Sequence, residues 1–351
     1  MTRTLRLVLP LAALVALALA APALAAYAPR LVVSSGAAGT TINFRQAPAD
    51  DPTAKLQIFA ASGLTANLSA AVGTTIGSVD AQAAAADLGG AILPLGGTVQ
   101  VRAAAGTYLS SGAQVPIAAA ATACTGTAAH GAFWVLILTA AGQTLELPLF
   151  IDAIPTGDPR AAFSVAVIQV CLSPPDVPAG TPGRATFGAK VLQAVFTVKG
   201  IFSSGAGEFR WRTAATPYTP GAGKANAAGT AETQSLVRTP STVSLAARKT
   251  KITKRAAVSG AVTENGQPVA GAAVQILVGK RVVGAARTNA SGRFAQTVRL
   301  PAARARLQAR AVVAARDLGA SACTATFSPV PCIGATVGGF TALSRTVAVS
   351  T

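Results

Sequence analysis

Residue types that could carry out catalysis are scarce in this chain. His130 is the single histidine among 351 residues, and it lies in the sequence GTAAHG without an acid beside it. Hydrolases of the Ser-His-Asp or Cys-His type need a histidine next to the nucleophile, and the serine often follows the pattern G-x-S-x-G, which does not occur here. We therefore interpret His130 as a turn residue and predict a non-catalytic protein.

The acidic residues offer little more for chemistry. Paired carboxylates can hydrolyse glycosides, and clustered ones can bind calcium. Asp50, Asp51, Asp152 and Asp158 lie beside proline or other turn residues, which is typical of solvated turn acids. Calcium binding by Asp152 and Asp158 is the alternative, and we otherwise expect no metal and no cofactor.

The first 25 residues have the pattern of a secretory leader. Arg3 and Arg6 form the positive end, Leu7 to Leu19 the apolar region, and Ala23-Leu24-Ala25 an A-x-A cleavage site. An uncleaved anchor helix is the alternative. Later apolar runs, such as Ala132 to Leu138, reach only about eight residues, whereas a spanning helix needs about 20. We expect a secreted or cell-surface protein without a transmembrane segment after cleavage.

Short apolar strands separated by Gly, Ser and Pro predict an all-β chain. Residues 26–216 contain about ten such strands, which favours a β-sandwich-like region and leaves open whether it is one sandwich or two. One exception is expected at Val79 to Leu88, where alanines could form a short helix. Residues 217–240, rich in Gly, Ala, Thr and Pro, are interpreted as a linker.

Four alternating strands with turn residues between them occupy Val258 to Leu300. The motif Gly266-x-Pro268-Val269-Ala270-Gly271-Ala272-x-Val274, followed by Thr288-Asn289-x-x-Gly292-x-Phe294, resembles carboxypeptidase-regulatory-like and bacterial immunoglobulin-like modules of secreted proteins. Asn289 stands where that turn usually carries Asp. The resemblance implies an immunoglobulin-like β-sandwich over residues 241–351 with a role in connecting or presenting domains.

The four cysteines are predicted to form disulfides. An even count in an exported chain favours bridges, and four cysteines permit three pairings. Two cysteines fall in each predicted module, which favours Cys124–Cys171 and Cys323–Cys332. The chain-entropy estimate gives roughly 4 kcal/mol for the first loop and roughly 3 kcal/mol for the second. Trp134 lies between the first pair and is interpreted as a core residue.

The positive charge is concentrated in the second module. Residues 27–240 hold twelve Lys/Arg and ten Asp/Glu, whereas residues 241–351 hold fifteen Lys/Arg against Glu264 and Asp317. The electrostatic field of such a basic module attracts polyanions, with an affinity that falls as the salt concentration rises. The favoured interpretation is that these cations only keep the exposed strands from aggregating. The alternative is an anionic cell-wall polymer or polysaccharide as partner; nucleic acid is not expected, because the module has few aromatic residues for base stacking.

Four residues are candidate ligand contacts. Arg306 and Arg310 alternate with apolar residues on one strand, so their guanidinium groups should face water. Trp211 and Tyr218 could bind a sugar, although Trp211 shares a strand face with Phe209 in the pattern of a core stripe. The sequence thus predicts a structural or adhesion-type protein, with carbohydrate or polyanion binding by the basic module as the alternative.

Overall fold

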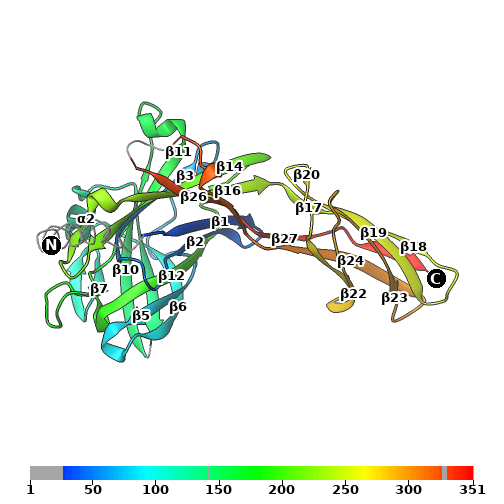
Figure 1. Ribbon diagram of the computed structural model, residues 1–351, viewed down its shortest axis with the longest axis horizontal. Helices are drawn as coiled ribbons and strands as arrows, with labels where there is room; N and C mark the ends of the chain where they lie inside the picture. The colour runs from blue at the N-terminus through cyan, green and yellow to red at the C-terminus, as the bar shows by residue number, and fades with distance from the viewer. Residues whose placement is uncertain (1–26, 141, 326–329, 351) are drawn as a thin grey trace, which may run out of the picture.

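The computed structural model describes residues 27–140, 142–325 and 330–350, and the expected leader lies outside these residues. It shows a large β domain with a smaller, elongated β module extending from one side (Figure 1). The all-β class is confirmed. Among the residues described, no helix has the length and hydropathy that crossing a lipid bilayer requires.

The large domain is one continuous curled sheet, which resolves the question of one sandwich or two. In spatial order the strands are β1 (Arg30–Gly36), β2 (Gly39–Arg45), β12 (Ala189–Val198), β5 (Thr75–Ala85), β6 (Ala91–Arg102), β9 (Ala132–Ala140), β10 (Gln143–Ala153), β11 (Ser164–Cys171), β3 (Thr53–Ala61), β14 (Gly207–Thr219), β16 (Ala231–Thr239), β26 (Cys332–Val337) and β25 (Arg316–Gly319), and β15 (Lys224–Ala225) pairs with β14. Neighbours pair antiparallel, except that β16 and β26 are parallel.

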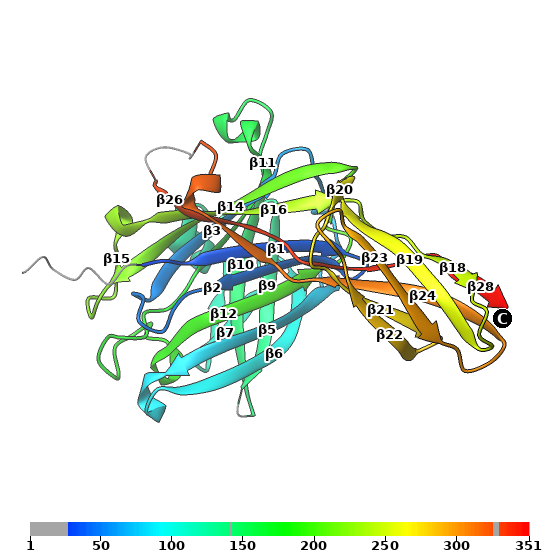
Figure 2. The same cartoon turned by 45° about the vertical axis from the view of Figure 1, so that its right-hand side comes forward.

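The sheet curls until its first strand meets its last ones. The amide of Val33 in β1 donates to Ser235 Oγ in β16 at 2.8 Å, and Thr336 Oγ1 in β26 donates to the carbonyl of Leu31 at 2.8 Å. Gly338 permits this approach, because a Cβ there would lie 1.9 Å from the Val33 carbonyl oxygen. Figure 2 shows β26 crossing beside β1 and β16.

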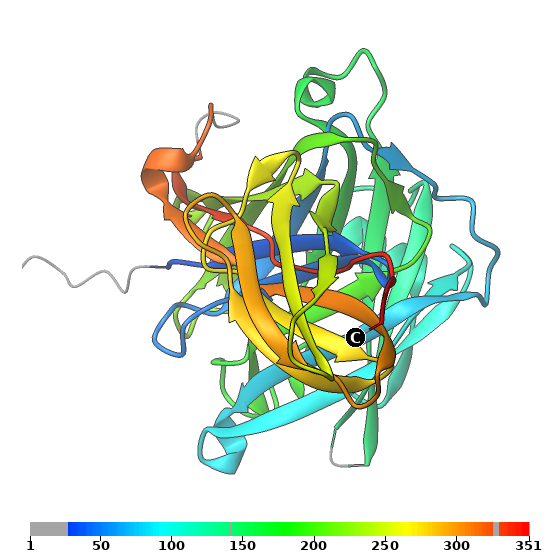
Figure 3. The same ribbon diagram turned by 90° about the vertical axis from the view of Figure 1, so that its right-hand side faces the viewer.

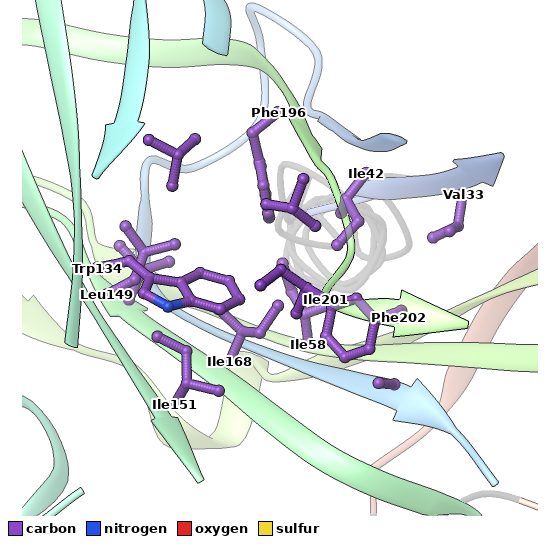
Figure 4. Packing of buried hydrophobic residues seen from close by; sticks show 14 of the residues in the cluster. Val33, Ile42, Ile58, Trp134, Leu149, Ile151, Ile168, Phe196, Ile201 and Phe202 are labelled. Carbon is purple, nitrogen blue, oxygen red and sulfur yellow. The ribbon is translucent and has the colours of Figure 1, made fainter. Parts of the chain in front are cut away.

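The core of the large domain lies inside this curl. Inward side chains alternate with outward ones along each strand, as a half-buried sheet requires. Trp134 and Trp211 are the largest fully buried side chains, and Trp211 packs edge-on against Phe202 with ring centroids 5.0 Å apart. Figure 4 shows this packing around Trp134, Ile58, Ile168 and Phe196. The interpretation of Trp134 as a core residue is confirmed.

Smaller elements cover the ends and the outer face of the sheet. Helix α2 (Ile117–Thr125) packs Ile117 and Ala121 onto the outward rings of Phe133 and Phe150. The remaining elements are β4 (Thr65–Ala66) with β13 (Phe202–Ser203), β7 (Thr107–Ser110) with β8 (Ala113–Pro116), and the 3₁₀ turns η1 (Ala86–Leu88), η2 (Pro159–Ala162), η3 (Thr186–Gly188), η4 (Ala227–Gly229) and η5 (Ala320–Ala322).

Two expectations for this region are wrong over part of their residues. The alanine run expected to be helical lies in strand β5 up to Ala85, because Ala83 and Ala85 both point into the core and tertiary packing overrides helix propensity. Its last residues, Ala86–Leu88, do form a helical turn, η1. Residues 231–239 of the expected linker form β16, which is buried between β14 and β26. The sequence of β16 does not show the apolar–polar alternation of a strand, because Thr233 and Ser235 are polar although they are buried.

The small module is a sandwich of two sheets, seen end-on in Figure 3. The first sheet contains β17 (Ser241–Val243), β18 (Ala246–Lys249), β19 (Arg255–Glu264), β20 (Gln267–Pro268) and β23 (Arg293–Arg299), and the second contains β21 (Ala273–Val278), β22 (Arg281–Arg287), β24 (Arg304–Val313), β27 (Phe340–Leu343) and β28 (Val347–Ser350). Ile276, Phe294 and Leu307 pack between them. The four strands expected between 258 and 300 are β19, β21, β22 and β23.

The module is not continuous in sequence. After β24 the chain leaves it, adds β25 and β26 to the large sheet, and returns as β27. The expected uninterrupted module over 241–351 is therefore wrong for residues 316–337. Arg316 in β25 binds Glu264 of the module at 2.8 Å, which fixes the two bodies to each other.

Candidate anion-binding face

Four arginines share the outer face of the first module sheet, and we call them the basic face: Arg248, Arg255, Arg293 and Arg299. Strand register places them together. Arg255 of β19 lies directly opposite Arg299 of β23, and Arg293 lies opposite Ala261. Arg248 of β18 lies opposite Ala257 on the other side of β19. All four side chains are exposed.

A shallow groove of about 560 Å³ runs along this face. Small residues form much of its surface, among them Ser244, Ser259 and Ala295, and Arg293 lines one end. Gly260 is required beneath it, because a Cβ there would lie 2.1 Å from the carbonyl oxygen of Ser244. At about 3.4 Å per residue, the pair Arg255–Arg299 lies about 20 Å along the strands from Arg293.

The basic face has no acid of the module to neutralise it. Glu264 accepts from Arg316 at 2.8 Å and lies 3.8 Å from Arg238, and Asp317 binds Arg30. Within the described residues, no carboxylate lies in ion-pair distance of the four arginines of the basic face.

Arginines of the large domain behave differently, because several are paired with carboxylates. Arg184 binds Asp87 with both terminal nitrogens, at 2.6 and 2.7 Å, and lowers the pKa of that carboxyl. Arg160 binds Asp158 and lowers its pKa to about 2. Like charges placed directly opposite each other destabilise a sheet, so the Arg255–Arg299 pair has no evident structural benefit.

Arg306 and Arg310, the predicted basic contacts, lie on β24 in the other sheet of the module. Both are exposed while Leu307, Ala309 and Ala311 are buried, as the alternation predicts. Arg310 donates to Gln275 Oε1 at 3.0 Å. They are therefore separated from the basic face by the core of the module. The sequence could not reveal the basic face, because β19 and β23 pair across 28 intervening residues.

Trp211 and Tyr218, the expected sugar contacts, are buried in the large domain. Trp211 is 1% exposed and Tyr218 8%, and Tyr218 lies in β14 rather than in a loop. The hydroxyl of Tyr218 donates to the carbonyl of Leu172 at 2.5 Å, and burial raises the pKa of its phenol. The expectation of an exposed aromatic contact is wrong for Tyr218, whereas the core stripe of Phe209 and Trp211 is confirmed and leaves no sugar contact at Trp211.

Both predicted disulfides are present. Cys124 of α2 is bonded to Cys171 of β11, and Cys323 is bonded to Cys332 of β26, with Cα–Cα distances of 5.7 and 6.2 Å. The first bridge fixes the helix to the outer face of the large sheet. The second joins Cys323, just after η5, to the start of β26, and the neighbouring carbonyls of Ala322 and Ala325 accept from Arg210 and Arg212 of β14. The bridges are consistent with an extracellular location.

His130 does have an acid beside it, contrary to the sequence interpretation. Its Nδ1 lies 2.8 Å from Asp152 Oδ2, and its Nε2 lies 2.9 Å from Thr125 Oγ1. Sequence reasoning missed this hydroxyl–imidazole–carboxylate arrangement because Asp152 lies in β10, 22 residues away. The imidazole has no exposed surface and stacks on Phe150, while Thr125 Oγ1 also donates to the carbonyl of Ala121. The arrangement joins the end of α2 to β10.

The expected turn acids are also engaged. Asp152 accepts from Gly131 as well as contacting His130, and Asp50 accepts from the amide of Ala47 at 2.7 Å. Within the described residues, no group of three or more His, Cys, Asp or Glu side chains is arranged to hold a metal ion. Asp152 and Asp158 are each committed to a protein partner, so the calcium alternative has no support in the geometry.

Comparison with known proteins agrees with the fold of the small module. Residues 241–328 match the family described as the archaeal bacterial Ig-like domain. A search of curated proteins gave no match. An Ig-like domain with this sandwich architecture is typical of structural or adhesion-type modules. The match covers the basic face, since Arg248, Arg255, Arg293 and Arg299 all fall within it.

Proposed function

We propose that this is a secreted or cell-surface, non-catalytic adhesion protein whose Ig-like module binds an extended polyanion along the basic face. The observation that carries the proposal is the like-charged Arg255–Arg299 pair on the same sheet face as Arg293, which lines the groove. Cations aligned along one sheet face beside a groove of small residues suit a linear ligand that carries anionic groups at intervals.

The expected ligand class is an anionic wall polymer or an acidic polysaccharide. The guanidinium group of arginine binds phosphate and carboxylate groups through bidentate hydrogen bonds. Nucleic acid is disfavoured because bases need aromatic rings to stack on. Phe294 and Phe340 of the module are buried, and Phe327 lies outside the described residues.

The test compares retention of the full mature chain on immobilised poly(glycerol phosphate), polygalacturonate and neutral dextran over a salt series. We expect retention on both anionic polymers at 50 mM salt and release by about 0.5 M, since screening at that ionic strength shortens the range of the attraction. The triple variant R255Q/R293Q/R299Q should bind at least tenfold more weakly, at about 1 kcal/mol for each cation removed.

A matched control removes the same charge elsewhere in the module. The triple variant R281Q/R287Q/R304Q changes three exposed arginines of the other sheet. We expect the affinity of this control variant for the anionic polymers to fall less than threefold. Equal losses in the two variants would show that only net charge matters, and absence of retention at low salt would remove the proposal altogether.

A further inference from the structure

The interior of the large domain contains a cavity that its side chains do not fill. Its volume is about 60 Å³, and all fourteen lining residues are apolar. Apart from Leu172, which follows β11, they come from the inward faces of seven strands, so the cavity lies inside the curl. At about 10–15 Å³ for each water-sized group, it has room for about four to six such groups. Water has no hydrogen-bond partner on these walls, and apolar cavities of this kind stay dry or hold apolar ligands.

One end of the cavity is bounded by buried side chains, and towards the other end its lining is only partly buried. Next to the lining residue Leu149 lie Trp134 and Ile151, both buried (Figure 4). Towards the opposite end the lining residues Leu147, Leu172 and Val191 are only half-buried. A slender apolar chain could therefore enter from that end.

A second hollow of about 710 Å³, which we call the vestibule, lies next to the cavity along β10. Leu145 lines the vestibule, and Leu147, two residues further on the same face of β10, lines the cavity. Phe187 also lines the vestibule with φ of 57°, a left-handed conformation that bulky residues rarely adopt. Backbone strain of this kind is concentrated at binding and switch sites.

The vestibule offers neutral hydrogen-bonding groups. Its polar side chains include Gln143, Thr144, Thr181 and Thr186. Arg184 is the one charged residue among those that line it, and its guanidinium is already bound by Asp87 with two hydrogen bonds. The vestibule therefore suits an uncharged polar group rather than a carboxylate or phosphate.

We propose that the large domain binds a single-chain amphiphile with an uncharged polar head, of the long-chain monoacylglycerol class. The end of the alkyl chain occupies the apolar cavity, and the rest of the chain and the hydroxylated head lie in the vestibule. This site is separate from the basic face, which lies on the Ig-like module.

The test uses the full mature protein and measures displacement of the neutral dye N-phenyl-1-naphthylamine by 1-monooleoylglycerol below its aggregation concentration. Ala81→Leu fills the cavity, since Ala81 lines it. Ala84→Leu makes the same change on the outward face of the same strand and is the matched control. We expect wild type and A84L to bind alike, and A81L to bind at least tenfold more weakly with an unchanged far-UV spectrum.

Three results would overturn the proposal: no displacement from the wild type, equal binding by A81L and A84L, or tighter binding of oleate than of monooleoylglycerol. If A81L does not fold, a diazirine-bearing monoacylglycerol is crosslinked to the wild type instead. Crosslinks should map to residues that line the cavity or the vestibule, and crosslinks confined to residues elsewhere would refute the site.

Discussion

A buried ion pair on the outer face of β14 allows a quantitative test of how the terminal segment is held. Arg212 lies 2.9 Å from Glu232 of β16, and their side chains are 8% and 0% exposed. The guanidinium also donates to the carbonyl of Ala325 at 2.6 Å and to Thr324 Oγ1 at 3.0 Å, and it lies over the ring of Phe163. The pair thus joins the curled sheet to the segment that precedes β26.

Removal of the cation should be costly. In R212M the carboxylate of Glu232 stays buried without this guanidinium, and breaking a buried pair in this way costs about 3–5 kcal/mol. The surface pair Arg160–Asp158 provides the contrast, since the Arg160 side chain is 41% exposed. Exposed pairs contribute about 0–1 kcal/mol, so R160M should change the stability of the protein by no more than that.

Urea unfolding of the disulfide-intact chain, followed by tryptophan fluorescence, measures both variants. The double variant R212M/E232M should recover most of the loss, because replacing both buried charges by apolar groups is often neutral. A loss below about 1 kcal/mol in R212M would refute the burial of this pair. A double variant less stable than R212M would show instead that packing of Arg212, not its charge, matters.

Two further predictions follow from contacts described above. Arg160 lowers the pKa of Asp158 from 3.8 to about 2. The stability that this carboxylate contributes is therefore fully present above pH 4 and is lost as the pH falls towards 2. NMR titration of Asp158 should give a midpoint near 2, and R160M should return that midpoint towards 3.8. Replacing Cys124 and Cys171 together by serine should lower the free energy of unfolding by about 4 kcal/mol, for a loop with a sequence separation of 47. A denaturation midpoint unchanged in the double-serine variant would contradict the second estimate.

Local turn chemistry explains why the strands of the small module could be predicted. Asn265 and Gly266 both adopt positive φ, as the hairpin between β19 and β20 requires. Asn289 accepts from the amides of Ser291 and Arg293, so asparagine makes the turn that aspartate makes elsewhere. Such signals lie within a few residues, and a single sequence displays them.

Features that depend on distant partners could not be predicted in the same way. Helix α2 was missed because its short alanine-rich run lies between strands, although Pro116 before it and Gly126 after it are ordinary helix boundary signals. The approach of Asp152 to His130 depends on the register of β10 with β9. The basic face depends on the pairing of β19 with β23, which neither strand encodes alone.

The way the module is attached bears on its proposed role. The chain passes between the two bodies three times, after β16, after β24 and after β26, rather than through the single linker expected from composition. Glu264 of the module adds contacts to Arg316 at 2.8 Å and Arg238 at 3.8 Å across the junction. A module on one flexible linker would lose orientational freedom each time it bound a polymer fixed to a surface. Because three crossings and these ion pairs already restrict that freedom, the basic face is held in one orientation, and under the proposed function tension on a bound polymer would pass directly into the hydrogen-bonded sheet of the large domain.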